Sequence, residues 1–470
     1  MAFWNRRKSL ASVSARTSHS ALKPTLSWPH LVGLGIGGIV GTGIYTLTGV
    51  GAGLAGPAVI LSFVVAGLVC ACAALAYTEM ATMMPMAGSA YTYSYVALGE
   101  LPAWIVGWTL ILEYTVVCSA VAVGWSGYAG GVIRSAGWDI PEALLAGPAA
   151  GGVINMPAIV IALAVAGLLA LGSRESATVN LVLVFVKLAA LATFIALALP
   201  AFDAGNFEPF APYGLGAAEV DGTKRGMMAA AAIIFFAFYG FDAVSTAAEE
   251  AKDPSRDLQI GIIGSMVGCT IIYMAVAAAA LGGSNYEALA ASSEPLAMVL
   301  RNLNHPFAAT LIAAAAVLAL PTVIMAFMYG QSRIFFVMAR DGLLPQRLSA
   351  VSERTGTPVL MTLVTGVIVA AIAGFLSLRE IAELANAGTL VAFIAVAVCM
   401  LVLRNKAPAH PRPFTVPAPW VIASGAIVGC AYLFVSLPLA TIYRFFIWNV
   451  VGVIVYFAYA RFYSALGRAA

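Results

Sequence analysis

Charged residues are scarce in this sequence. Asp, Glu, Lys and Arg make up 10% of its 470 residues, against about 25% in ordinary soluble domains. The hydrophobic share of 61% exceeds the usual roughly 45–50%. No soluble fold hides so much apolar surface, so the composition excludes a soluble protein and predicts an integral membrane protein. The formal net charge of +3 is too small to indicate a nucleic-acid partner.

Histidine and cysteine are too few, and too scattered, for metal or disulfide chemistry. The four histidines form no ligand pair. The six cysteines all lie inside apolar runs, which argues against a disulfide framework or a metal site. The sequence also has no phosphate-binding loop, nucleotide-binding fingerprint or hydrolase elbow. We therefore expect neither an enzyme nor a cofactor.

Long apolar runs fill the rest of the chain. Each is long enough to cross a hydrocarbon layer of ~30 Å, and we predict twelve spans near residues 28–50, 57–83, 102–131, 156–172, 178–200, 227–249, 260–282, 306–331, 358–376, 381–403, 420–437 and 442–463. Most Lys and Arg residues lie in the loops that are cytoplasmic if the N-terminus is, so both termini are predicted inside. The basic, Ser-rich residues 1–27 lack a signal-peptide pattern, and we interpret them as a solvated cytoplasmic arm.

Two of the predicted spans carry their own helix breaker. The first reads GIGGIVGTGIY at residues 35–45, with Gly41, Thr42 and Gly43 halfway along it. The sixth is interrupted at a corresponding depth by FFAFYGFDA, residues 235–243. Two sets of five helices that each begin with a broken helix indicate an inverted repeat. The expected units are an arm (1–27), a first repeat (28–200), an external loop with the second repeat (201–403), and two further spans with a tail (404–470).

The breaks have a physical use. A broken helix exposes N–H groups with partial positive charge and carbonyls with partial negative charge. Such backbone is tolerated at membrane depth only where it is buried in protein or lines a cavity. The α-carboxylate and α-ammonium of an amino acid would satisfy both ends. The alternative is that Gly37-x-x-x-Gly41 is only a small-residue packing face, and the second break favours the binding site.

Four stretches carry a resemblance to a known family. They are GIVGTGIYTLTG, AYTEMATMMPMAGSAYTYSYVALGELPAWIVGWTLILEY, FFAFYGFDAVSTAAEEAKDPSRDLQIGI and SRIFFVMARDGLLPQRLSAVSERTGTPVL. From about residue 28 to 404 the chain resembles the amino acid–polyamine–organocation superfamily, most closely its cationic amino acid transporter branch. The resemblance implies an all-α, LeuT-like fold of five plus five helices with discontinuous helices 1 and 6, secondary active transport, and alternating access.

The resemblance also implies a substrate site. The backbone N–H groups expected to bind the carboxylate belong to Thr42, Gly43 and Ile44. The carbonyls expected to hold the ammonium belong to Ile39, Phe236, Ala237 and Tyr239. Phe236 would also act as an aromatic gate over the substrate, and Met325 in the eighth span would line the side-chain pocket.

Lys187 is the candidate for proton coupling. It lies about nine residues from the nearer end of its span, or ~14 Å, which is too far for easy snorkelling. A buried charge costs at least ~2.5–3.5 kcal/mol there, so burial favours release of the proton. In sodium-coupled relatives a bound cation links spans 1, 5 and 8, and the Lys187 ammonium resembles a built-in substitute that bridges to a carbonyl such as that of Gly38. The alternative is a permanently charged structural lysine.

Two mid-span carboxylates remain open to several roles. Glu113 could contact the substrate side chain, share the coupled proton, or make a packing hydrogen bond. Asp242, two residues after Gly240, is expected to cap the second half-helix, with an electrostatic bias toward cations as the alternative.

A further group of charges lies near the predicted cytoplasmic face. These residues could form an ion-pair network that closes an inward gate, or be ordinary solvated loop charges: Glu79, Glu249, Glu250, Arg333, Arg340 and Asp341.

Together these features predict a transporter. We expect proton-coupled symport of cationic or small neutral amino acids such as alanine, with no cofactor besides the coupling proton. The alternatives are a proton-independent amino acid or amine exchanger and an amino acid-sensing receptor on the same fold. The expected partners are the substrate and the lipid bilayer of the cell membrane; an accessory subunit cannot be predicted from the sequence.

Overall fold

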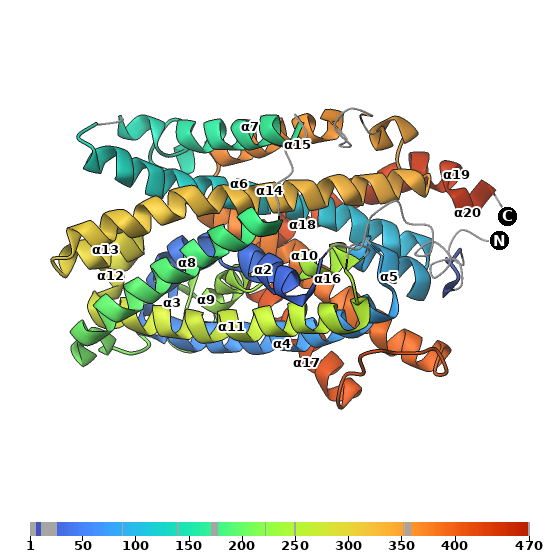
Figure 1. The fold of residues 1–470 in the computed structure, drawn as a ribbon, viewed down its shortest axis with the longest axis horizontal. Helices are drawn as coiled ribbons and strands as arrows, with labels where there is room; N and C mark the ends of the chain where they lie inside the picture. The colour runs from blue at the N-terminus through green and yellow to red at the C-terminus, as the bar shows by residue number, and fades with distance from the viewer. Residues whose placement is uncertain are drawn as a thin grey trace.

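The computed structural model describes residues 6–10, 26–86, 88–138, 141–170, 177–220, 222–248, 251–350, 352 and 359–468. Nearly all of them are helical. The strands in this part of the chain are β1 (Ala218–Val220) and β2 (Thr223–Arg225), which form one antiparallel hairpin. The long helices run side by side along the longest axis of the molecule, and both ends of the chain lie at one end of that axis (Figure 1).

Helices of membrane-spanning length make up the bundle. Within the described residues, nine candidates are long and apolar enough to cross a membrane, and two shorter apolar helices accompany them. The first candidate, Trp28–Met83, contains more than one helix. The main helices are α2 (Trp28–Ile39), α3 (Thr48–Ala55), α4 (Val59–Met83), α5 (Ser89–Ala97), α6 (Glu100–Ser135), α7 (Met156–Ala170), α8 (Ala177–Ala198), α9 (Met227–Ile234), α10 (Phe241–Thr246), α11 (Pro254–Gly283), α12 (Tyr286–Ala291), α13 (Pro295–Asn302), α14 (Pro306–Arg340), α15 (Val359–Phe375), α16 (Leu378–Lys406), α17 (Pro419–Ser436) and α18 (Leu439–Val455). The prediction of a helical membrane protein is confirmed.

Short helical pieces connect and extend these helices. Two are π-helical, η2 (Gly43–Leu47) and η11 (Tyr456–Ala460). The chain ends in two short helices, α19 (Arg461–Tyr463) and α20 (Ala465–Arg468). The 3-10 segments are η3 (Gly56–Ala58), η4 (Glu142–Leu144), η5 (Pro148–Ala150), η6 (Leu199–Ala201), η7 (Ala204–Phe207), η8 (Phe235–Ala237) and η10 (Gln346–Ser349).

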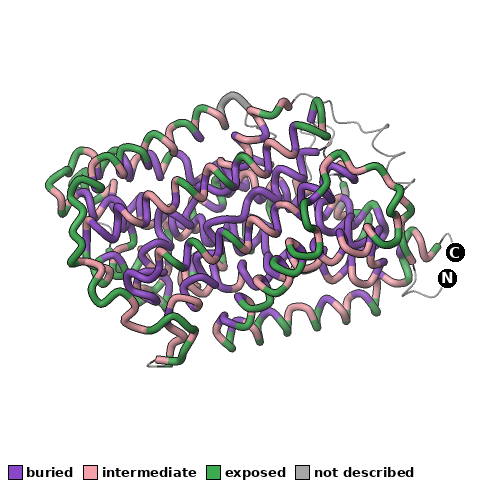
Figure 2. The backbone as a smooth tube through the Cα atoms, turned by 90° about the horizontal axis from the view of Figure 1, so that it is seen from below, coloured by how far each residue is buried: buried purple, intermediate pink, exposed green. Residues whose placement is uncertain are grey.

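Burial separates central helices from peripheral ones. Helix α6 is buried along most of its length, whereas less than a third of α17 and of Leu439–Tyr463 is buried. Exposed apolar side chains such as Phe185 (72% exposed), Ile271 and Val421 point away from the bundle. Figure 2 shows the same division, with buried residues along the middle of the bundle and exposed ones on its outside. An apolar outer surface of this kind suits lipid contact rather than water.

Both predicted helix breaks are present. Helix α2 ends at Ile39, Val40 leaves the helical conformation with ψ 89°, and the chain resumes in η2 and α3. Helix α9 ends at Ile234, η8 follows, and Gly240 with φ 124° precedes α10. That backbone conformation belongs to the positive-φ region that only glycine enters readily.

The two breaks touch each other through their backbones. A methyl group added to Gly240 would lie 2.7 Å from the carbonyl carbon of Gly38. A methyl group added to Gly43 would lie 2.4 Å from the Cα atom of Ala237. Glycine is therefore required at both crossings for close approach, and at Gly240 also for its positive φ. The contacts explain why both breaks lie at one depth in the bundle.

The N-terminal segment corrects one expectation. Residues 6–10 are not a solvated arm, because Arg6 Nη1 lies 3.2 Å from Glu100 Oε1 and Lys8 Nζ lies 2.5 Å from Asp341 Oδ2. Both carboxylates are buried. A buried carboxylate is strongly destabilising without a counterion, so these two hold the basic segment against the bundle.

The expected gate network is also arranged differently. Glu79 on α4 accepts hydrogen bonds from Arg404 Nε at 2.9 Å and from the Val416 amide at 2.9 Å, which ties α4 to α16 and the segment after it. Arg340 instead stacks over the Phe336 ring, and Arg333 over Tyr329. Glu79 pairs with both Arg404 and Arg412, and Asp341 pairs with Lys8, so these two carboxylates are not ordinary solvated loop charges. That such ion pairs close an inward gate stays a prediction. Residues 249 and 250 lie outside the described part of the chain.

Candidate functional site

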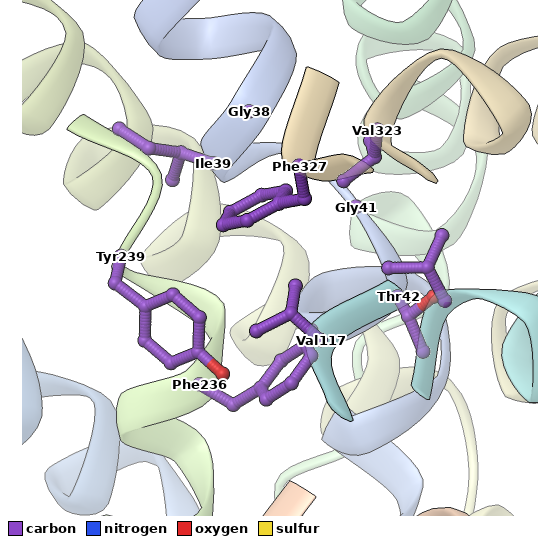
Figure 3. Close-up of a pocket in the computed structure, with 11 residues that line it drawn as sticks. Gly38, Ile39, Gly41, Thr42, Val117, Phe236, Tyr239, Val323 and Phe327 are labelled. Atoms are coloured by element: carbon purple, nitrogen blue, oxygen red, sulfur yellow. The ribbon is translucent and has the colours of Figure 1, made fainter. Parts of the chain in front are cut away.

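A small cavity lies where the two breaks meet. Its wall is formed by the end of α2, by η2, by one face each of α6 and α14, and by η8 with the residues after it (Figure 3). The space inside is close to that needed for one water molecule, about 10 Å³. The lining residues are Gly38, Ile39, Gly41, Thr42, Gly43, Val117, Val121, Phe236, Tyr239, Val323 and Phe327.

The wall of the cavity is apolar on the side away from the breaks. Val117 and Val121 from α6 face Val323 and Phe327 from α14, and no lining side chain is charged. The polar lining side chains are Thr42 and Tyr239. Within the described residues, neither hydroxyl has a hydrogen-bond partner. The cavity thus combines free polar groups at the breaks with a hydrocarbon wall opposite them.

Most of the predicted substrate residues lie at this cavity. Ile39, Thr42, Gly43, Phe236 and Tyr239 line it, and so does Gly41, which was predicted as part of the break rather than as a substrate residue. Ile44 and Ala237 lie just behind the lining, and Ala237 packs directly on Gly43.

The prediction for Met325 needs correction. Val323 and Phe327 line the cavity from α14, and Met325 does not. Consecutive helical residues are about 100° apart, so Met325 is rotated about 200° from either neighbour and faces the other side of the helix. Resemblance identified the right helix but the wrong face.

The carbonyls at the end of α2 are taken by groups from three different places. Ile36 O accepts from the Val40 amide at 2.8 Å, within the same helix. Ile39 O accepts from the Tyr273 hydroxyl of α11 at 2.6 Å. Gly37 O accepts from Lys187 Nζ of α8 at 3.0 Å. Gly37 O and Ile39 O are among the last four carbonyls of the helix, which lack the N–H partners of a continuous helix, and here side chains of other helices bond them.

Lys187 is fully buried and joins three helices. Its ammonium lies 3.3 Å from Thr322 Oγ1 of α14 as well as 3.0 Å from Gly37 O of α2. The predicted bridge from span 5 to the first break is therefore present, but its acceptor is Gly37 rather than Gly38. The Gly38 backbone is instead packed against Gly240. The carbonyl that faces Lys187 on α8 is therefore that of Gly37.

Tyrosines hold the segment after the first break. The Tyr128 hydroxyl of α6 donates to Tyr45 O at 2.6 Å, and the two rings meet edge to face. The Tyr45 hydroxyl donates to Lys187 O at 3.4 Å. The π-helical turn is thereby attached to α6 and α8 at once.

The second break has its own set of partners. Asn386 of α16 donates from Nδ2 to Ala232 O at 2.6 Å and to Ile233 O at 3.1 Å. Asp242 Oδ1 accepts from the Gly240 amide at 3.0 Å, and Asp242 Oδ2 accepts from the Tyr114 hydroxyl at 3.0 Å. Asp242 therefore does bond a backbone N–H at the start of α10, although it does so from the first turn, with Gly240 in the N-cap position.

Glu113 is close to the cavity without lining it. It is buried one helical turn before Val117, and its Cβ packs against Gly388 of α16. Thr389 lies beside it and beside Tyr239. In the described part of the chain, Glu113 Oε2 has no hydrogen-bond partner. The geometry places Glu113 behind the wall, so the expectation of direct substrate contact is not met in this conformation.

Several residues at the site were missed in the sequence. Tyr273, Tyr128, Thr322 and Asn386 each hold a backbone group or Lys187 near a break. The sequence could have indicated them, because polar residues inside membrane spans are energetically costly and usually face the interior of the bundle. Metal ligation is not indicated within the described residues, where no three His, Cys, Asp or Glu side chains come together.

Known proteins resemble this chain along almost its whole length. The profile of the family described as amino acid permease matches residues 26–457. The Bacillus subtilis (strain 168) protein named branched-chain amino acid permease BcaP is 43% identical over 468 residues, which cover 98% of this chain and 99% of the relative. The B. subtilis (strain 168) protein named methylthioribose transporter is 40% identical over 466 residues, with coverage of 98% and 99%. The Arabidopsis thaliana protein named cationic amino acid transporter 2, vacuolar, is 37% identical over 415 residues, with coverage of 86% and 63%.

Proposed function

Since this chain belongs to the amino acid permease family, we propose that it is a proton-coupled symporter of neutral amino acids with short or branched apolar side chains. A transporter rather than an enzyme follows from the family and from the names of the relatives. The observation that carries the rest is the cavity, which joins two helix breaks to an uncharged wall.

The backbone of the two breaks would bind the part that all amino acids share. The N–H groups of Thr42, Gly43 and Ile44, which follow the first break, would hold the carboxylate. The Ile44 N–H donates to Gly41 O at 3.2 Å, so it would have to exchange that partner for the substrate. The carbonyls around the ammonium would be those of Ile39, Phe236, Ala237 and Tyr239. Phe236 and Tyr239, whose ring centroids are 5.0 Å apart, would close over the bound substrate.

The wall opposite the breaks supports a neutral side chain. A cationic side chain placed between Val117, Val121, Val323 and Phe327 would lose its hydration without gaining a counterion, which is strongly unfavourable. Because the cavity has room for about one water molecule, an amino acid enters only after its lining moves. To gain a counterion, a cationic side chain would have to reach past the wall to the carboxylates behind it, those of Glu113 and Asp242.

Lys187 would couple the proton to this movement. Its ammonium joins α8, α2 and α14 through charge-assisted hydrogen bonds, which are roughly twice as strong as neutral ones. Loss of the proton would weaken both bonds and allow α2 to separate from α8. A bound proton would therefore favour one arrangement of the first break, as alternating access requires.

The proposed architecture is two sets of five spans followed by two more. In it, Trp28–Met83 supplies two spans, and the short helices α7 and α15 are the fourth and ninth. The units are residues 1–27, 28–200, 201–403 and 404–470, and the second set is inverted relative to the first. Both termini, which lie at one end of the bundle (Figure 1), would be on the cytoplasmic side of the cell membrane.

Uptake into proteoliposomes tests the proposal. Labelled leucine, alanine and lysine are supplied with and without an inward proton gradient. We expect the gradient to drive accumulation of leucine and alanine, and lysine uptake to stay near that of empty liposomes. Accumulation that ignores the gradient would indicate an exchanger, binding without accumulation a receptor, and gradient-driven lysine uptake a cationic substrate. Competition by methylthioribose shows whether the site accepts the solute in the name of the second relative.

A further inference from the structure

We propose that Asn386 is the second-half counterpart of Lys187: a positioning residue that fixes the second break to α16, and that keeps its hydrogen bonds whatever the protonation state of Lys187. The inference rests on the proposed transport function and on the proposed arrangement of two sets of five spans. It concerns a residue whose hydrogen bonds go to backbone carbonyls and which does not line the cavity.

The hydrogen bonds of Asn386 are directed at the end of a broken helix. Its side chain is fully buried, and Nδ2 reaches Ala232 O at 2.6 Å and Ile233 O at 3.1 Å. Helix α9 ends at Ile234, so both acceptors are among its last four carbonyls, which a continuous helix would have satisfied by itself. An amide NH₂ group offers two donors, and both are used here.

Lys187 and Asn386 occupy matching places in the two halves. Lys187 lies on the fifth proposed span and bonds the first, and Asn386 lies on the tenth and bonds the sixth. Gly37 is two residues before the last residue of α2, Ile39, and Ala232 is two residues before the last residue of α9, Ile234. The donors are also at similar depth, ten residues after Ala177 and eight residues after Leu378, where their helices begin.

The chemistry of the two donors differs in one respect. A lysine ammonium can release its proton, whereas an amide neither gains nor loses one in the physiological range. The bond between α16 and α9 therefore persists through the cycle, while the bond between α8 and α2 can weaken. One break is fixed, and the other responds to protons.

Holding the second break in place also orients the cavity wall. Phe236 follows Ile233 by three residues and lines the cavity together with Tyr239. If Asn386 released the end of α9, both aromatic side chains would lose the backbone support that aims them at the substrate. Asn386 thus acts on the substrate through Phe236 and Tyr239, and it touches neither substrate nor proton.

A titratable replacement gives the sharpest test. The protonated Asn386→Asp side chain can donate one hydrogen bond to Ala232 O, whereas the ionised form can only repel both carbonyls. Asn386→Leu has no donor at any pH. We measure leucine exchange in proteoliposomes at equal internal and external pH, so that no gradient is needed and the test survives failure of the coupling proposal.

The expected results are specific. Relative to wild type at the same pH, exchange by Asn386→Leu falls about tenfold or more across the range. Exchange by Asn386→Asp is near wild type at low pH and falls as pH rises. Two results would overturn the proposal. One is an exchange rate of Asn386→Leu equal to that of wild type, and the other is a ratio of Asn386→Asp exchange to wild-type exchange that does not change with pH. If Asn386→Leu does not fold, the Asn386→Asp profile alone decides.

Controls separate this effect from other titrations and from general damage. The elements packed against α16 carry titratable groups, and normalising to wild type at each pH removes their contribution: Glu113 and Tyr114 (α6), Tyr77 (α4), Tyr93 (α5), Tyr239 (after η8) and, on α16 itself, Glu383. Asn449 on α18 is a matched intramembrane asparagine, because its Nδ2 also donates to a backbone carbonyl, that of Phe445, at 3.0 Å. Asn449→Asp should show no such pH-dependent ratio.

Discussion

The two helix breaks meet at one cavity, yet they are held by different chemistry. The end of α2 is held by an ammonium from Lys187 and a hydroxyl from Tyr273. The end of α9 is held by the amide of Asn386, and the start of α10 by the carboxylate of Asp242. The difference teaches that two helix breaks of similar geometry can differ in how they respond to protons, because one is held by a titratable donor, Lys187, and the other by a neutral one, Asn386. In the proposed arrangement of two sets of five spans, such a difference would let a single proton move one half relative to the other.

The largest effect is expected at the charged donor. Lys187→Ala removes both charge-assisted bonds at the first break, so gradient-driven accumulation should fall about tenfold or more, while leucine exchange persists. The measurement is uptake with and without a proton gradient. Lys224→Ala is the matched control, because Lys224 also donates to two backbone carbonyls, those of Val435 and Leu437, but far from the site. Equal loss in both variants would contradict a specific role for Lys187.

The next effect concerns the crossing of the breaks. Gly240→Ala places a methyl group 2.7 Å from the Gly38 carbonyl carbon at φ 124°. The conformation alone costs on the order of 1–3 kcal/mol, and the clash adds to it. We expect a lower melting temperature and a severalfold reduction in transport. Gly214→Ala meets the same kind of strain at φ 77° with no atom within 4 Å, so it reports the strain alone and should be milder.

A smaller and more selective effect is expected on the wall between the breaks. Val117→Leu adds one methylene to a cavity that has little space to spare, and one methylene changes discrimination by ~10–200-fold in a hydrophobic site. The ratio of leucine to alanine uptake should fall by about tenfold, with alanine transport largely retained. Met325→Leu, on the other face of α14, should leave the ratio unchanged. If Val117→Leu did not change the ratio of leucine to alanine uptake, the side chain of the substrate would have to bind elsewhere.

The smallest effect is expected at the neutral donor of the first break. Tyr273→Phe removes one hydrogen bond to Ile39 O, worth about 1 kcal/mol net, so KM for leucine should rise about fivefold with little change in proton dependence. Tyr128→Phe, which frees Tyr45 O instead, provides the comparison, since Tyr45 does not line the cavity. A changed proton dependence in Tyr273→Phe would mean that the neutral and charged donors act together.

The sequence allowed a good part of this arrangement to be predicted. Glycines in the middle of apolar runs located both breaks, because lipid-exposed backbone cannot be left unpaired. The depth of Lys187 in its run predicted a buried charge that must find an acceptor. These features depend on position along the chain, which a sequence displays directly.

The remainder depends on how helices rotate against one another. Spacing could not decide between Gly37 and Gly38 as the acceptor for Lys187, or between Met325 and its neighbours Val323 and Phe327, because each choice turns on which face of a helix points inward. Asn386 was visible as a polar residue in LANAGTL, but its partners are more than 150 residues away. The composition of residues 6–10 predicts a solvated arm, because nothing in it reveals the two buried carboxylates that attract this segment.

The Glu100 carboxylate connects the beginning of the chain to its end. Arg6 approaches it from the N-terminal segment, and the hydroxyls of Tyr456 and Ser464 donate to it from the last helices. During synthesis this cluster cannot be completed until nearly the whole chain has left the ribosome. Through most of membrane insertion Glu100 therefore has only its early partners, Arg6 and Tyr95. A nascent chain that stops before residue 456 carries a buried acid without the two C-terminal hydroxyl donors.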